Sequence, residues 1–185
     1  MSEREGTLTV TTWTLEMRAV PSRALRRPPG GARIERVARP EVHLYRYLYE
    51  TVGREWLWVD RRRMGDAELG EIIRHPAVEL WVLYDGGAPS GYYELDGRVP
   101  DAVELAYFGL FPHAIGRGLG SALLDHSIGR AFELLPPGPA ARFWVHTCSL
   151  DHPRALGTYQ RAGFVVIDEL THPSPDPRPL PITPR

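Results

Sequence analysis

Three glycines alternate with other residues directly before an apolar run, at Gly116, Gly118 and Gly120. Glycine destabilises regular structure, so three of them before a predicted helix should serve some purpose. A backbone without Cβ atoms can approach a ligand closely, and the first turn of a helix presents unpaired N–H groups that favour an anion. The segment therefore predicts a phosphate-binding loop, with Arg117 as a permanent positive charge beside it.

Two well-known phosphate loops do not fit this segment. A Walker loop requires a lysine, and the chain contains none. A dinucleotide-binding loop requires a glycine at the sixth position of its motif, which is Ser121 or Leu123 here, depending on the frame. The pattern leaves open a tight turn without a ligand and a phosphate-binding loop of another kind.

A second motif, "HPRALGTYQRAGF" (152–164), follows the glycine segment "IGRGLG" (115–120) after one predicted strand. Both segments resemble the GNAT N-acetyltransferase superfamily. The first is similar to its Gln/Arg-x-x-Gly-x-Gly/Ala loop, with Ile115 at the Gln or Arg position. The second is similar to its Asn-x-x-Ala-x-x-x-Tyr-x-x-x-Gly-Phe helix, with His152 at the Asn position. The resemblance implies acetyl-CoA as co-substrate, bound by Phe108, Gly109, Leu110, Ile115, Gly116, Arg117, Gly118, Leu119, Gly120, Ser121 and His152.

Acylation of an amine needs a group that removes a proton from the amine, a donor that polarises the thioester and a proton for the leaving thiolate. The resemblance places Glu104 at the position of the glutamate base of some relatives, and Tyr159 at that of a tyrosine facing the cofactor sulfur. The alternatives are a substrate ligand or an exposed strand end for Glu104, and core packing for Tyr159. We expect Gly109 to form a bulge that opens a gap beside strand 103–111.

The acceptor site that the resemblance implies lies beside the first two helices and their connection, "GREWLWVDRRR" (53–63). We expect Tyr49, Trp56 and Trp58 to form an apolar or cation–π wall for an amine, with negative charge from Glu94. Alternatively, these aromatic side chains belong to the core and the arginines form a solvated run.

His146, Cys148 and His152 suggest a nucleophile or a metal site. Alternation along a strand places His146 and Cys148 on the same side. A cysteine nucleophile needs a low-pKa thiol in an electropositive site, and a metal site needs a third ligand at suitable spacing. We therefore expect neither a cysteine nucleophile nor a metal.

The elements that must position these residues alternate between strand and helix patterns, which predicts an α+β domain with one mixed sheet. The GNAT resemblance implies a mostly antiparallel twisted sheet, splayed at the strand before the glycine loop, with about four helices. The expected strands are 8–17, 32–38, 78–84, 90–96, 103–111, 141–149 and 164–170, and the expected helices are 40–52, 66–75, 119–135 and 153–162.

The bulk composition is that of an ordinary globular protein, with 185 residues, 43% hydrophobic residues and a net charge of −1. We expect a cytoplasmic protein with no nucleic-acid or membrane partner. The predicted division is an N-terminal extension with an extra strand and a Pro/Arg-rich loop (1–31), an N-acetyltransferase domain (32–170) and a Pro-rich tail (171–185). The extra strand leaves pairing within the domain or across a homodimer open.

The sequence therefore predicts an enzyme that transfers an acetyl group directly from acetyl-CoA to a primary amine of a small molecule or peptide in a ternary complex. Two alternatives remain. One is an inactive module of the same fold that binds CoA. The other is an interaction protein whose proline-rich ends dock a partner.

Overall fold

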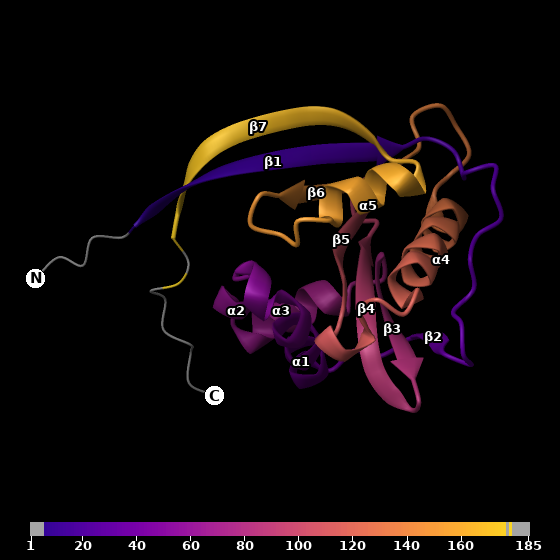
Figure 1. Cartoon of the computed structure of the whole chain (residues 1–185), viewed down its shortest axis with the longest axis horizontal. Coiled ribbons are helices and arrows are strands. Elements are labelled where there is room, and N and C mark those ends of the chain that lie inside the picture. Colours follow the sequence, from indigo (N-terminus) through magenta and orange to yellow (C-terminus); the bar gives the residue numbers. More distant parts are fainter. Residues whose placement is uncertain (1–5, 177, 179–185) are drawn as a thin grey trace, which may run out of the picture.

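One mixed sheet of seven strands organises the protein (Figure 1). The computed structural model describes residues 6–176 and 178. Among these residues the strand order is β2-β3-β4-β5-β6-β1-β7, and β5 and β6 are the one parallel pair. The mostly antiparallel mixed sheet expected from the sequence is confirmed. The strands are β1 (Thr7–Met17), β2 (Arg33–Arg36), β3 (Val78–Asp85), β4 (Ala88–Asp96), β5 (Ala102–Leu110), β6 (Arg142–Cys148) and β7 (Val165–Pro175).

The helices cover the two faces of the sheet and form two cores (Figure 1). Alternation along β4 explains this, because the buried Tyr92 packs in one core and the buried Tyr93 in the other. The helices on the Tyr92 face are α1 (Val42–Gly53), α2 (Asp60–Arg63) and α3 (Asp66–Ile73), with the short η1 (Arg54–Trp56). Those on the Tyr93 face are α4 (Leu119–Leu134), preceded by η2 (Pro112–Ala114), and α5 (Ala155–Ala162).

β5 and β6 diverge after three residue pairs, the last of which joins Glu104 to Trp144. Beyond this point β5 continues beside β4 and β6 continues beside β1. The two strands therefore form a fork at the centre of the sheet. The splay expected at the strand before the glycine loop is confirmed.

The bulge in β5 lies at Ala106 instead of at Gly109. The register against β4 shifts there, so that Leu105 and Tyr107 both have partners and Ala106 is the extra residue. This shift lets Leu105 pack toward α4 while Tyr107 packs toward α1. Gly109 serves a different purpose, because a Cβ atom there would lie 2.2 Å from Cγ1 of Val52 on α1.

β1 is an inner strand of the sheet. It pairs with β6 over Thr12–Met17 and with β7 over Thr7–Glu16, so its pairing lies within the chain. The β1–β7 pair arches beyond the other strands (Figure 1). Residues 171–175, expected in the Pro-rich tail, belong to β7, whereas residues 177 and 179–185 of that predicted tail lie outside the described residues.

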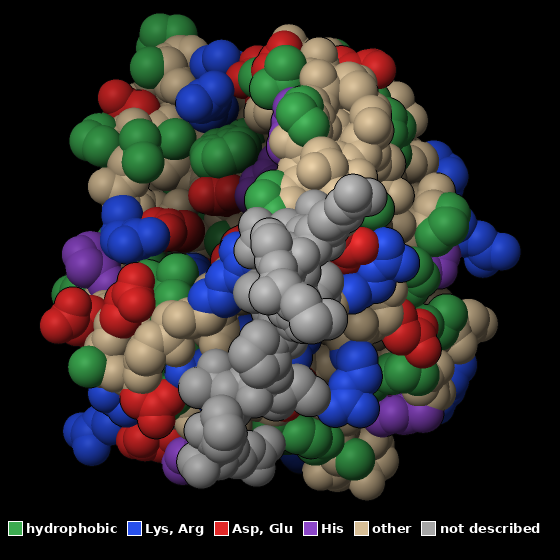
Figure 2. Space-filling view, turned by 90° about the vertical axis from the view of Figure 1, so that its left-hand side faces the viewer, with side chains coloured by type: hydrophobic (Ala, Val, Ile, Leu, Met, Phe, Trp, Pro, Cys, Tyr) green, Lys and Arg blue, Asp and Glu red, His purple; other side chains and the backbone are tan. Residues whose placement is uncertain are grey.

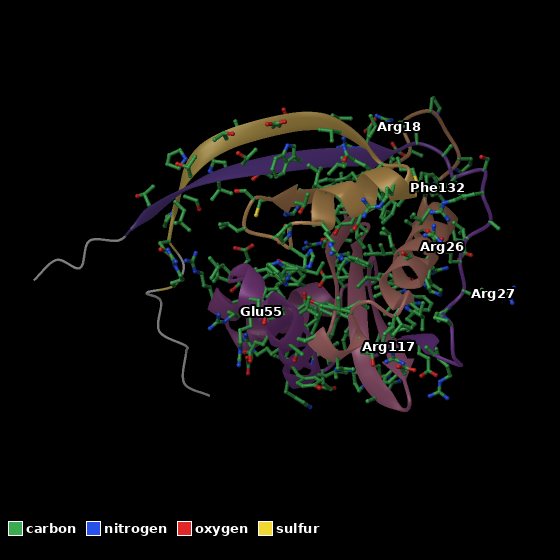
Figure 3. All side chains as sticks on the ribbon, viewed as in Figure 1. Arg18, Arg26, Arg27, Glu55, Arg117 and Phe132 are labelled. Carbon is green, nitrogen blue, oxygen red and sulfur yellow. The ribbon has the colours of Figure 1, made fainter. Side chains whose placement is uncertain are left out.

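The arginine-rich segment between β1 and β2 packs along α4, where Figure 3 shows Arg26 and Arg27. Asp125 of α4 is 1% exposed, and its two oxygens accept hydrogen bonds from Arg23 at 2.6 Å each. The backbone N–H of Arg26 donates to the same carboxylate at 2.8 Å. Sequence reasoning did not single out Asp125, although an acidic residue inside an apolar helix run near many arginines was a usable signal.

Candidate active site

The glycine loop presents an open backbone at the start of α4. Gly116 and Gly118 have φ values of +83° and +76°, and a Cβ atom on either would meet nothing within 4 Å. Gly118 is the N-terminal cap residue of α4, and no side chain caps the helix there. The first-turn N–H groups are therefore left for a ligand or solvent. Gly120 lies against β5, because a Cβ atom there would be 3.3 Å from Cδ1 of Leu110.

The side chains of the loop contribute less than its backbone. Arg117 forms an ion pair with Asp85 of the β3–β4 hairpin at 2.5 Å, and Figure 3 shows it beside that hairpin. Ile115 is 52% exposed and can donate no hydrogen bond. Leu119 is buried and anchors the first turn of α4, where Ser121 is half-buried. The positive charge expected from Arg117 is thus partly compensated by Asp85.

The fork separates two sets of polar side chains, one on each face of the sheet. Glu104 and His146 lie on the face of α1–α3, opposite to the buried Val103 and Val145 of the α4 core. Oε1 of Glu104 lies 3.1 Å from Nδ1 of His146. This contact joins the two arms of the fork just beyond their last residue pair.

Tyr159 and Phe108 lie on the opposite face, in the core formed with α4 and α5. Their ring centroids are 6.2 Å apart, and Tyr159 is 7% exposed. Burial raises the pKa of the Tyr159 phenol, and the charge of Asp151 adds to this shift. The hydroxyl therefore stays protonated at neutral pH and can donate a hydrogen bond.

Aromatic side chains from α1, the η1–α2 connection and β5 pack together on the Glu104 face. The ring of Trp58 lies 5.4 Å from that of Tyr49 and 5.3 Å from that of Tyr107. Tyr49 is 1% exposed, and its hydroxyl accepts a hydrogen bond from the backbone N–H of Arg61 at 3.3 Å. Tyr49 is therefore a core residue, whereas the half-buried Trp58 and Tyr107 reach the surface beside the fork.

The fork is bridged at its open end by the β6–α5 loop. Nε1 of Trp58 donates to Oδ1 of Asp151 at 2.9 Å, while Oδ2 accepts from the Thr147 hydroxyl at 2.8 Å. The ring of Trp56 lies 4.9 Å from that of His152. Nδ1 of His152 accepts from the backbone N–H of Arg154 at 3.0 Å, so this nitrogen is already committed within the chain.

Glu94 departs from the expectation that it faces a substrate. It is fully buried, and its carboxylate accepts hydrogen bonds from Arg61 at 2.6 Å and from the Tyr45 hydroxyl. Burial raises the pKa of the Glu94 carboxyl, and the Arg61 guanidinium opposes this shift. The alternative of a solvated arginine run does not hold for Arg61, which is 6% exposed and lies 5.2 Å from the Tyr107 ring centroid. The carboxylate neutralises this arginine instead of an amine.

Figure 2, which views the molecule from the left of Figure 1, shows arginines and acidic side chains interspersed over the part not covered by grey atoms. Within residues 6–176 and 178, no helix is long and apolar enough to span a membrane. The same residues hold no group of three or more His, Cys, Asp or Glu side chains arranged for a metal ion.

Comparison with protein families identifies the family of this chain. The family model of the GNAT acetyltransferases matches residues 45–164, which include the fork, the glycine loop and the Tyr159 helix. The chain belongs to the GNAT acetyltransferase family. No curated protein matches the sequence.

Solved structures share this GNAT fold at low sequence identity. A GCN5-related N-acetyltransferase from Sphaerobacter thermophilus has a TM-score of 0.68 at 16% identity, over 90% of this chain and 52% of its own. A GCN5-related N-acetyltransferase from Kribbella flavida has a TM-score of 0.58 at 17% identity, over 92% of this chain and 60% of its own. An IAA acetyltransferase from Bacillus cereus has a TM-score of 0.54 at 20% identity, over 75% of this chain and 79% of its own. The chain thus spans little more than half the length of the first two proteins.

The residues present fit acetyl-CoA, the co-substrate of GNAT acetyltransferases. The positive φ values of Gly116 and Gly118 create space beside uncapped N–H groups, which suits a diphosphate. The fork leaves the inner edges of β5 and β6 without further ladder pairs among the described residues, which suits a ligand that carries amide groups. The two features adjoin, because Gly120 of the loop packs against Leu110 of β5.

Proposed function

We propose that this protein transfers an acetyl group from acetyl-CoA to a primary amine of a small molecule or peptide. The observation that carries the proposal is the fork between β5 and β6, with a glycine loop at one end and candidate proton-transfer groups on opposite faces. An opening through a sheet gives two substrates access from two sides. Such access permits direct transfer without a covalent enzyme intermediate.

The binding of acetyl-CoA is proposed to depend mainly on main-chain groups. The N–H groups of residues 116–121 hold the diphosphate, and the edge of β5 at Phe108, Gly109 and Leu110 pairs with the amides of the pantetheine arm. A backbone N–H from this edge polarises the thioester carbonyl. His152 lies in the β6–α5 loop, where its ring contacts that of Trp56 edge to face.

The chemistry then needs two proton transfers. A basic group on the Glu104 face removes a proton from the ammonium, and the neutral amine attacks the thioester carbonyl. A C–N bond forms and the C–S bond breaks, while the amine nitrogen loses its second proton. The thiolate receives a proton, with the Tyr159 hydroxyl as donor of a hydrogen bond from the other face. The candidates for the basic group are Glu104 and His146, which lie within hydrogen-bond distance of each other.

The acceptor amine is proposed to enter on the face of α1 and α2. Trp58 and Tyr107 form the aromatic wall beside the fork, with Trp56 at its outer end. An aromatic wall of this kind attracts a cation through its ring faces. Since Glu94 is buried, the negative charge on this side comes from Glu104, Asp151 and Asp60.

The proposal is tested by following the release of free thiol from acetyl-CoA with a panel of amines. We expect turnover with at least one amine, and a lower kcat in Glu104→Gln, because this variant changes the proton-transfer groups on that face of the fork. Tyr159→Phe should lower kcat with a smaller effect on CoA affinity. Tight CoA binding without thiol release across a broad panel would support the alternative of an inactive CoA-binding module.

Binding is tested separately with a matched pair of glycine variants. Gly118→Ala and Gly31→Ala both place a Cβ atom at a positive φ, +76° and +77°, with nothing within 4 Å. Each is expected to lose about 1–2 kcal/mol of stability from the strained backbone. Only Gly118→Ala should also weaken CoA binding in calorimetry. Equal CoA affinity in the two variants would contradict the proposed diphosphate site.

A further inference from the structure

The hydrogen bond between Glu104 and His146 connects the two arms of the fork at its apex. The last ladder pair joins Glu104 to Trp144, and His146 is the next residue of β6 on the same face. Its Nδ1 lies 3.1 Å from Oε1 of Glu104. The two groups therefore act as a pair, and the question is which of them meets the acceptor amine.

Exposure distinguishes the two members of the pair. The side chain of His146 is 52% exposed, whereas that of Glu104 is 22% exposed. Because Nδ1 faces the carboxylate, the outer nitrogen, Nε2, is the one left to contact solvent or a ligand. Among the described residues no hydrogen bond to Nε2 is formed. The imidazole thus places a free basic nitrogen at the surface of the fork.

The charges around the imidazole favour its work as a base near neutral pH. Hydrogen bonding to Glu104 raises the pKa of His146 above its ordinary value, and the charges of Asp151 and Asp60 act in the same direction. The residue of β1 that pairs with His146 is the uncharged Thr14. The next acidic side chain of β1, Glu16, is engaged by Arg18 and Arg142.

We propose that His146 is the catalytic base of this fork, and that Glu104 is a positioning residue that holds Nδ1–H and orients Nε2 toward the acceptor. This inference rests on the proposed function. Nε2 takes a proton from the acceptor ammonium, which leaves a neutral amine and an imidazolium next to the Glu104 carboxylate. The amine then forms the C–N bond as the C–S bond breaks, and its second proton passes to the leaving thiolate. The half-exposed imidazolium returns its proton to solvent.

The experiment compares His146→Gln, Glu104→Gln and wild-type protein in kcat measured against pH with a saturating amine. In wild type we expect kcat to rise with pH as the imidazole loses its proton, through a pKa above 6.5. Glu104→Gln removes the carboxylate, so this limb should move to lower pH. His146→Gln should lose the limb and about 10²-fold or more of kcat at pH 7.5.

His43→Gln is the matched control, because His43 is exposed on α1, outside the contacts of the fork, and should leave kcat unchanged. NMR titration of the His146 ring provides a readout besides activity. It should show a lower imidazole pKa in Glu104→Gln than in wild type. Thermal stabilisation by CoA shows that each variant is folded and binds its co-substrate.

The outcomes separate this inference from the proposed function. A wild-type protein that releases no thiol with any amine overturns the proposed function and the base assignment with it. A wild-type protein that turns over, with unchanged kcat and pH profile in His146→Gln, overturns the base assignment alone. In that case the Glu104 carboxylate is the base, and Glu104→Gln alone should abolish turnover.

Discussion

The close approach of α1 to β5 can be tested at Gly109. A Cβ atom at this position would lie 2.2 Å from Cγ1 of Val52, and 3.5 Å and 3.6 Å from its Cβ and Cγ2. Nonbonded carbon atoms prefer about 3.5–4.0 Å, so Gly109→Ala forces a movement of more than about 1 Å. Val52 is 6% exposed and packed in the α1 core, which leaves its side chain little room to turn away.

Overpacking of this kind costs about 1–3 kcal/mol, so Gly109→Ala should lower the free energy of unfolding by that amount. For a chain of this length, this loss corresponds to a decrease in Tm of about 2–12 °C. Urea unfolding followed by tryptophan fluorescence measures it. The control is Gly157→Ala, whose Cβ atom meets only the end of the flexible Arg161 side chain, at 3.0 Å. That variant lies within a helix and should be neutral or more stable by up to about 1 kcal/mol.

A double variant tests whether the clash with Val52 is the cause. Val52→Ala alone removes two buried methyl groups and should be destabilising, by about 1.5–3 kcal/mol. In the presence of Gly109→Ala the new methyl group occupies part of the vacated space. The two losses should therefore not add, with a favourable coupling of about 1 kcal/mol or more. A loss below about 0.5 kcal/mol in Gly109→Ala, or strictly additive losses, would refute the reasoning.

Three further predictions concern the ion pairs that hold the elements around the site. Asp125→Asn removes the anchor of the segment between β1 and β2. Because Arg23 is partly exposed, we expect a loss of about 1–3 kcal/mol and faster tryptic cleavage after Arg23 or Arg26 in a gel time course. Although burial pushes the pKa of the Glu79 carboxyl up, hydrogen bonds from Arg130 and Trp81 hold it below its ordinary value. The stabilisation from the ionised Glu79 carboxylate is thus present above pH 4.5 and lost as the pH falls. The midpoint of urea unfolding should therefore decrease less at acid pH in Glu79→Gln than in wild type. Arg61→Met leaves Glu94 buried and unpaired and should lose about 3–5 kcal/mol in urea unfolding, most of it regained in Arg61→Met/Glu94→Gln.

Local patterns predicted most of the fold because each of them reports on local physics. The alternation of β4 shows which side chains face which core, and the glycines before α4 mark a backbone that must adopt positive φ. The bulge at Ala106 was placed wrongly because a glycine is the usual local signal for an irregular strand. Here the shift is set by the opposite packing of Leu105 and Tyr107, which is a tertiary property.

The candidate site was less predictable, because burial decides which charged groups are free. Arg61 has three charged neighbours in sequence, and nothing local distinguishes it from them, yet it alone of "DRRR" is buried against Glu94. The pairing of Glu104 with His146 also depends on a parallel register between strands 42 residues apart in the chain. Such long-range contacts are absent from any local window.

The position of β1 explains how the sheet can be open at its centre and still hold together. β6 pairs with β1 from Phe143 to Cys148, and β5 pairs with β4 from Glu104 to Leu110. Each arm of the fork thus has a continuous partner on its outer edge, so the arms need not pair with each other. Backbone groups left on the inner edges carry a free-energy penalty unless they find partners. In the proposed complex, the amide groups of acetyl-CoA would remove that penalty, and the outer pairing by β1 and β4 keeps the fork open for them.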